Sequence, residues 1–198
     1  MNDRRRKVGG VGEDRTQEPL FPFAGRLPEV HPTAWIAPTA AVIGDVVVGP
    51  DSSIWFHCVV RGDVNRVRIG ARTNVQDGTI IHVNRETYPC LIGNDVTIGH
   101  RAIVHACTLE DGAFVGMGAI VLDGAVIEQG GMLAAGSVLP PGKVIPRDEL
   151  WAGVPAQVLR KLDRPTDAFF ARTAAHYADL AAHYRAEYRA RAPGKEAE

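Results

Sequence analysis

The chain has 198 residues, of which 45% are hydrophobic and 23% charged, and its formal net charge is −1. That length and composition predict one globular domain with a sizeable core and exclude bulk disorder. The near-neutral charge gives no electrostatic support for nucleic-acid or membrane-surface partners, and no apolar run approaches the ~18 residues of a membrane span.

Residues 1–19 predict a disordered N-terminal tail ahead of the folded domain. The segment has no apolar stretch of the signal-peptide kind, and its acidic residues argue against a mitochondrial transit sequence. The three cysteines are an odd number and form no CxxC pair. A disulfide framework is therefore not expected, and we predict a cytoplasmic location.

A six-residue repeat runs through residues 20–162. From Leu109 to Trp151 an aliphatic or aromatic residue recurs at every sixth position, and a glycine follows most of them three residues later. This period fits a short strand, a turn and another short strand, rather than a helix or one long strand. Three such hexads close one triangular coil, and coils stack about 4.8 Å apart by parallel strand pairing. We therefore predict an all-β solenoid, a parallel β-helix whose hand the period does not determine.

Two insertions interrupt the repeat. One lies between Val60 and Ile69, and the other lies between Ile81 and Ile92, at about residues 85–90. Extra residues between hexads must loop out of the prism, and loops of that kind commonly carry function.

Residues 163–192 predict one long C-terminal α-helix. Aromatic and small residues recur there at helical spacing, from Phe170 through Tyr177 to Tyr184, and Pro165 suits a helix start. We expect the aromatic stripe to pack along the β-helix or along a neighbouring chain.

The repeat register places two of the seven histidines side by side. We label the faces of the prism a, b and c in chain order, so that positions 69 and 92 begin face a, 75 and 98 begin face b, and 81 and 104 begin face c. His82 and His105 each follow the first residue of a face c hexad, so they occupy the same position on adjacent coils. Their Cα atoms are expected about 4.8 Å apart, and two imidazoles at that separation can share one zinc ion.

His100 belongs to a different edge of the prism. It lies two residues after Ile98 on face b, so it cannot easily join the other two histidines within one chain. A three-fold trimer would bring it to His82 and His105 of a neighbouring subunit. Three protein ligands with an open fourth position describe a catalytic zinc site.

Polar residues surround these histidines in the same register. Arg61 lies one coil below His82 in the same column, and Asp63 follows it closely. These two residues could form an ion pair across a subunit boundary or a purely structural pair. Gln76 and Asp77 lie on face b, with Asp77 one coil below the third histidine. Such polar groups would orient a metal-bound hydroxide and its substrate.

The other histidines and the cysteines are interpreted as structural. We interpret His31 and His57 as turn residues, and His176 and His183 as helix residues that face solvent. The cysteines comprise core residues at Cys58 and Cys107 and a loop thiol at Cys90. From spacing alone, Tyr177 is interpreted as helix packing rather than chemistry.

Four segments resemble the gamma-class carbonic anhydrase family. They are VVRGDVNRVRIG, TNVQDGTIIHV, VTIGHRAIVHAC and ELWAGVPAQVLRKL, and the resemblance covers about residues 28–192. It implies a left-handed parallel β-helix of hexapeptide repeats with a C-terminal α-helix, as in the compact bacterial subgroup. It also implies a homotrimer with a metal at each subunit interface, either Zn²⁺ or, as alternatives, Fe²⁺ or Co²⁺.

The resemblance assigns roles to single residues. It implies metal ligation by His82, His100 and His105. It implies that Arg61 and Asp63 form a catalytic ion pair linked to substrate bicarbonate. It implies that the pocket residues Asn74, Gln76 and Asp77 orient bound water, and that Tyr177 is a catalytic helix tyrosine that faces the site.

Two proton-shuttle glutamates of the family have no counterpart here. Val64 follows Asp63 where the first glutamate is found, and Arg85 stands at the second position with Glu86 beside it. Because proton export limits a fast hydratase, this departure affects turnover more than metal binding.

The leading hypothesis is reversible hydration of CO2 to bicarbonate by a metal-bound hydroxide at the trimer interface, a carbonic anhydrase (lyase) activity. The alternatives are an acyl-CoA thioesterase that uses the same metal site and a catalytically inactive trimeric scaffold or subunit. An acyltransferase would need a catalytic base and a CoA site, but it has no use for three histidines in register.

Overall fold

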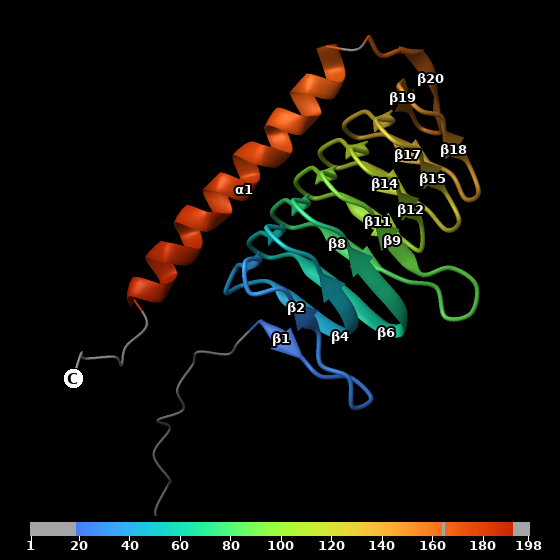
Figure 1. The fold of residues 1–198 in the computed structure, drawn as a ribbon. Coiled ribbons are helices and arrows are strands. Elements are labelled where there is room, and N and C mark those ends of the chain that lie inside the picture. The colour runs from blue at the N-terminus through green and yellow to red at the C-terminus, as the bar shows by residue number, and fades with distance from the viewer. Residues whose placement is uncertain (1–18, 164, 192–198) are drawn as a thin grey trace, which may run out of the picture.

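The computed structural model describes residues 19–163 and 165–191 (Figure 1). Short parallel strands stack coil upon coil into a triangular prism, and a helix runs along one side of it. The prediction of a parallel β-solenoid with a C-terminal helix is confirmed. Except for residue 19, the N-terminal tail expected at 1–19 lies outside the described residues.

Face b is one sheet of parallel strands that ends in an antiparallel pair. Each strand pairs with the equivalent strand of the next coil, so that Thr97 lies opposite Asn74 and Phe114 lies opposite Thr97. The strands of this sheet are β3 (Trp35–Ile36), β5 (Ser53–Ile54), β7 (Asn74–Val75), β10 (Thr97–Ile98), β13 (Phe114–Val115), β16 (Met132–Leu133), β19 (Glu149–Gly153) and β20 (Ala156–Lys161).

Faces c and a form a second sheet, because two long strands pass from one face to the other. These long strands are β4 (Ala41–Val48), which pairs with β1 (Leu20–Phe21) and β2 (Glu29–Val30), and β6 (Val59–Ile69). Face c continues with β8 (Ile80–His82), β11 (Ile103–His105), β14 (Ile120–Val121) and β17 (Val138–Leu139). Face a continues with β9 (Cys90–Ile92), β12 (Thr108–Leu109), β15 (Val126–Ile127) and β18 (Val144–Ile145).

The hexad residues identified in the sequence fill the inside of the prism. Ile81, Ile98 and Leu109 are all buried, as is each later member of the series up to Ile145. The coils approach so closely that a Cβ on Gly99 would lie 2.7 Å from the backbone nitrogen of Met117. The six-residue period therefore reflects one inward aliphatic side chain per face, with glycine where the coils are in closest contact.

The two insertions take different forms. The first lies inside β6, whose pairing with β4 shifts register between Gly44 and Val46. It is carried by a paired strand rather than a free loop, because β4 supplies a partner on both sides of the extra residues. The second leaves the prism as a loop between β8 and β9 (Figure 1).

Helix α1 (Pro165–Arg191) runs back along face b and contacts β3, β5, β7 and β10 (Figure 1). Its aromatic side chains pack on those of the first coils: the ring centroids of Tyr177 and Trp55 are 5.5 Å apart, and those of Tyr184 and Trp35 are 5.1 Å apart. The expected packing along the β-helix is confirmed, although the side chain of Phe170 lies outside the described residues. No helix in the described part of the chain has the length and apolar character needed to cross a membrane.

The interpretation of Cys90 as a loop thiol is wrong. Cys90 is the first residue of β9 and is completely buried, because it and Ile92 both point inward on the alternating strand. The core interpretation of Cys58 and Cys107 is confirmed.

All three thiols are expected to resist alkylation in the folded protein. Burial raises the pKa of the Cys58 thiol to about 12, above the ~8.5 of an exposed thiol. The stability that the buried, protonated Cys58 thiol contributes is therefore fully present below pH ~8.5 and is lost as the pH rises towards 12. Thiol titration at pH 8 should detect none of the three before denaturant is added and all three afterwards. A thiol that reacts at once in the native protein would contradict this burial.

Candidate metal centre

His82 and His105 lie side by side at the edge between faces c and a. They end strands β8 and β11 and are direct partners in the parallel register, as the sequence predicts. Their ring centroids are 5.2 Å apart, and His82 Nδ1 lies 3.2 Å from His105 Nε2. Two ring nitrogens at this distance share either one proton or one cation.

In each ring, the nitrogen that points away from the other histidine contacts a carboxylate. His82 Nε2 lies 3.0 Å from Asp63 Oδ1, and His105 Nδ1 is hydrogen bonded to Asp123 Oδ1. The second oxygen of Asp63 is ion-paired with Arg61 of the same chain. The Arg61–Asp63 pair is thus formed within one subunit, where the sequence analysis also considered a pair across a boundary.

Both carboxylates are held in their charged form. Burial alone would raise the pKa of Asp63, but hydrogen bonds from His82 and Arg61 outweigh it and lower the pKa. Burial likewise opposes ionisation of Asp123, and hydrogen bonds from His105 and Asn84 lower its pKa. Each imidazole therefore has an anion at the ring nitrogen that points away from the other imidazole. This arrangement suits a cation between the two facing nitrogens.

Asp123 and Asn84 are site residues that the sequence analysis missed. Asn84 Nδ2 donates to Asp123 Oδ2 over 2.9 Å. The repeat contained a partial signal: because Val121 is paired with Val104, Leu122 is the residue one coil above His105, and Asp123 is the next residue along the chain. No register argument places Asn84, which lies in the loop between β8 and β9 that carries the second insertion.

His100 lies on the edge between faces b and c. It follows β10, and its Nδ1 atom lies 2.9 Å from Asp77 Oδ2, one coil below, as the register predicts. Burial, and after it the charge of Asp77, raises the pKa of the Tyr177 hydroxyl on α1. Among residues 19–163 and 165–191, no group of three His, Cys, Asp or Glu side chains is close enough to hold a metal ion.

Asn74 and Gln76 lie on face b and not beside the paired histidines. Both are buried, and Gln76 Nε2 donates to Asn74 Oδ1 over 3.1 Å. Asn74 Nδ2 in turn donates to Thr97 Oγ1 over 2.9 Å. Their expected role at bound water stays a prediction.

The outer surface of face c is apolar and lies between the two histidine-bearing edges. Ile80 and Ile103 are 44% and 38% exposed, and they are paired in register. Ile120 and Val138 continue the column on the next two coils. An exposed aliphatic column in a parallel sheet is typical of a surface that another protein covers.

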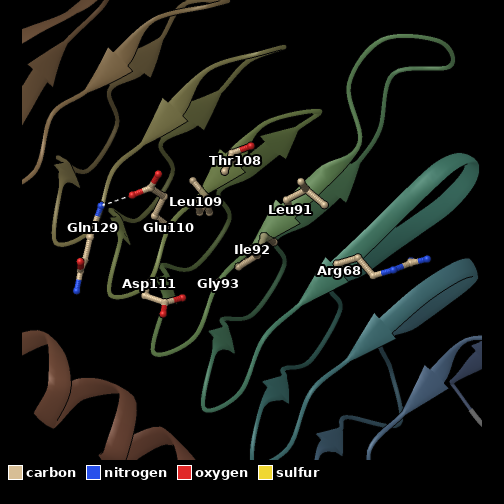
Figure 2. A pocket seen from close by; sticks show the side chains of 9 residues that line it. All are labelled: Arg68, Leu91, Ile92, Gly93, Thr108, Leu109, Glu110, Asp111 and Gln129. Carbon is tan, nitrogen blue, oxygen red and sulfur yellow. Dashed lines mark hydrogen bonds between the residues drawn. The ribbon is translucent and has the colours of Figure 1, made fainter.

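Two surface hollows lie at different places relative to the candidate centre: the first lies apart from it and the second beside it. Figure 2 shows the first, of about 430 Å³ on face a, whose lining includes Arg68, Leu91 and Glu110 but none of the residues predicted for the site. The second, of about 320 Å³, opens beside Asp63 and is lined in part by Val64. The smaller hollow therefore reaches the candidate centre at Asp63, and neither of the paired histidines is on its lining.

Comparison with known proteins gives a consistent set of relatives, although no family model matches the chain. It is 40% identical over 167 residues to a carbonic anhydrase of Geobacillus kaustophilus, across 84% of this chain and 91% of the relative. It is 47% identical to the mitochondrial gamma carbonic anhydrase 1 of Arabidopsis thaliana, across 82% of this chain. The chain spans 61% of the length of that plant protein.

A solved structure with the same architecture bears a different description. The crystal structure of a hexapeptide transferase family protein from Anaplasma phagocytophilum is 48% identical and has a TM-score of 0.80. The match covers 83% of this chain and 97% of that one.

Proposed function

The chain belongs to the gamma carbonic anhydrase family, and from this premise we propose that it is a metal-dependent hydratase that interconverts CO2 and bicarbonate. The observation that carries the proposal is the 3.2 Å separation of the facing nitrogens of His82 and His105, each ring having a carboxylate behind it. The proposed site is shared between two chains of a homotrimer.

The residues fit a divalent cation. Two nitrogens bound tetrahedrally at 2.0–2.1 Å are separated by about 3.4 Å, close to the 3.2 Å found here. Asp63, Asp77 and Asp123 carry three negative charges behind the histidines and Arg61 one positive charge, so a divalent ion would bring the site to neutrality. Imidazole donors suit Zn²⁺, Fe²⁺ or Co²⁺, and we propose Zn²⁺.

The third ligand would come from a neighbouring chain. His100 lies across face c from His82 and His105, and the aliphatic column of Ile80 and Ile103 lies between these edges. A three-fold arrangement that buries face c brings unlike edges of two chains together, so each interface would receive two histidines from one chain and one from the next. The same contact between chains would also cover the exposed aliphatic column of face c.

Each residue of the site would have a defined task. His82, His100 and His105 would hold the metal, which supplies a water ligand of near-neutral pKa as the nucleophile. Asp63 would fix the ring of His82 through the hydrogen bond described above, and Asp77 would orient the ring of His100 through the 2.9 Å contact with its Nδ1 atom. Arg61 remains available beside the site to orient an anionic product, because its side chain is 41% exposed.

Proton export is the expected weak point of this hydratase. Val64 lines the hollow beside Asp63, at the place where the family has a shuttle glutamate, and valine cannot accept a proton. We propose that buffer molecules take over this step, so that turnover rises with buffer concentration.

Cytoplasmic location stays a proposal, because the plant relatives are named as mitochondrial proteins. A structural neighbour from Bacillus cereus, provisionally described as an acetyltransferase, keeps an acyl-CoA substrate as the competing function. Both the acyl-CoA thioesterase and the acyltransferase would release free CoA.

Stopped-flow CO2 hydration by the zinc-loaded and metal-stripped protein tests the proposal. We expect metal-dependent turnover that increases with imidazole buffer, and no thiol release from acetyl-CoA with or without an amine acceptor. Hydration at the uncatalysed rate by fully metal-loaded protein would contradict the proposed activity. Thiol release under the same conditions would favour the competing function.

A further inference from the structure

The loop of the second insertion is attached to the candidate metal centre through Asp123. One oxygen of this carboxylate is hydrogen bonded to His105 Nδ1, and the other accepts from Asn84 Nδ2. Asn84 is the second residue after β8 and lies in the loop that leaves the prism. The hydrogen-bonded series therefore runs from the loop, through a carboxylate, to a proposed metal ligand.

The orientation of the Asn84 side chain is fixed by its own loop. Its Oδ1 atom accepts from the backbone nitrogens of Glu86 and Thr87, at 3.2 and 3.4 Å. The amide nitrogen must then point the other way, where Asp123 is its acceptor. Asn65 Nδ2 also donates to the backbone carbonyl of Asn84, so a residue of the first insertion supports the loop between β8 and β9.

A second contact docks the loop on the turn that carries Asp123. The ring of Tyr88 covers Gly124, where an added Cβ would lie 3.0 Å from Tyr88 Cζ. Gly124 also has a φ of +68°, which disfavours side chains. The carboxylate is therefore fixed by its turn and by the loop packed against it.

A carboxylate at His105 Nδ1 has a definite chemical consequence. An ionised carboxylate only accepts hydrogen bonds, so Nδ1 must carry the ring proton. In a neutral imidazole Nε2 then has the free lone pair, and this is the atom that faces His82. The free lone pair is the form in which a histidine binds a metal.

We propose that Asp123 is the positioning residue of His105, that Asn84 holds Asp123 in place, and that the second insertion therefore buttresses the metal centre. This inference rests on the proposed function, because it assumes that His105 binds a metal. Asp63 is hydrogen bonded to His82, and Asp77 Oδ2 lies 2.9 Å from His100 Nδ1, so an aspartate lies beside each proposed ligand.

The test is the affinity and spectrum of Co²⁺ in the full-length Asp123→Asn protein. Chelator competition should show a 10- to 100-fold loss of affinity, about the range for a lost partner of a metal ligand, and the visible absorption of Co²⁺ should change. Asp95→Asn is the matched control, because Asp95 is an ion-paired aspartate on another edge that contacts Arg72 and no histidine. This control should bind Co²⁺ as the wild type does.

The outcomes separate this inference from the proposed function. Wild-type affinity and an unchanged Co²⁺ spectrum in Asp123→Asn would overturn the inference alone. A wild type that binds no Co²⁺ would overturn the proposed function and this inference with it. If Asp123→Asn fails to fold, Asn84→Ala decides: a severalfold loss of affinity supports the inference, and wild-type affinity overturns it.

Discussion

Replacing His105 with alanine is expected to remove the metal and the hydratase activity together. His105 is half of the facing pair, and its loss leaves one ring nitrogen in each chain at that edge. Changes outside the ligands alone cost 10- to 100-fold in affinity or activity, so loss of a ligand should cost more than about a hundredfold. Elemental analysis and stopped-flow hydration of the same preparation check both effects.

The matched control for this experiment is His183→Ala. His183 is exposed on α1, where its Nδ1 atom lies 2.9 Å from the carbonyl oxygen of Asp179 one turn earlier. It should retain metal and turnover, and both variants should keep the wild-type sedimentation coefficient. Full hydratase activity in His105→Ala would contradict the assignment of the metal centre.

Replacing Ile103 with aspartate is expected to dissociate the trimer. Ile103 lies between Ile80 and Ile120 in the exposed column of face c. An aspartate at the centre of an apolar interface would be buried without a partner, at a cost of several kcal/mol in each of three interfaces. Analytical ultracentrifugation should detect monomers, and the metal content should fall because the third histidine of each site comes from the neighbour.

Val144→Asp provides the control on another face. Val144 is 41% exposed on face a, nearly the same as the 38% of Ile103, and it also occupies an outward strand position. This variant should remain trimeric and metal-bound. An Ile103→Asp protein that stays trimeric would show that face c is not the interface.

The repeat allowed much of the backbone to be predicted, because a solenoid couples sequence position directly to location. Positions six residues apart share an inward direction, and equivalent positions on successive coils are strand partners. The pairing of His82 with His105 and of Asp77 with His100 could therefore be derived from spacing alone. The burial of Ile81 and Ile98 follows from the same rule.

What the sequence could not predict lies at the insertions, where the register is lost. Cys90 was assigned to a loop because the strand after the second insertion begins earlier than its hexad suggests. Asn84 reaches Asp123 only because the loop folds back on the turn at Gly124, a contact that depends on tertiary packing. The hydrogen bond between Gln76 and Asn74 on face b depends on side-chain rotamers, which spacing does not give.

The central claim is that each metal centre takes ligands from two chains, and mixed trimers test it most directly. Chains with His100→Ala and chains with His105→Ala, carrying different tags, would be co-expressed, and trimers bearing both tags purified. Neither homotrimer can form a complete site, whereas every mixed trimer contains one interface with all three histidines. We expect about one metal ion per mixed trimer, with about a third of wild-type activity. Mixed trimers as empty and inactive as the two homotrimers would contradict this claim.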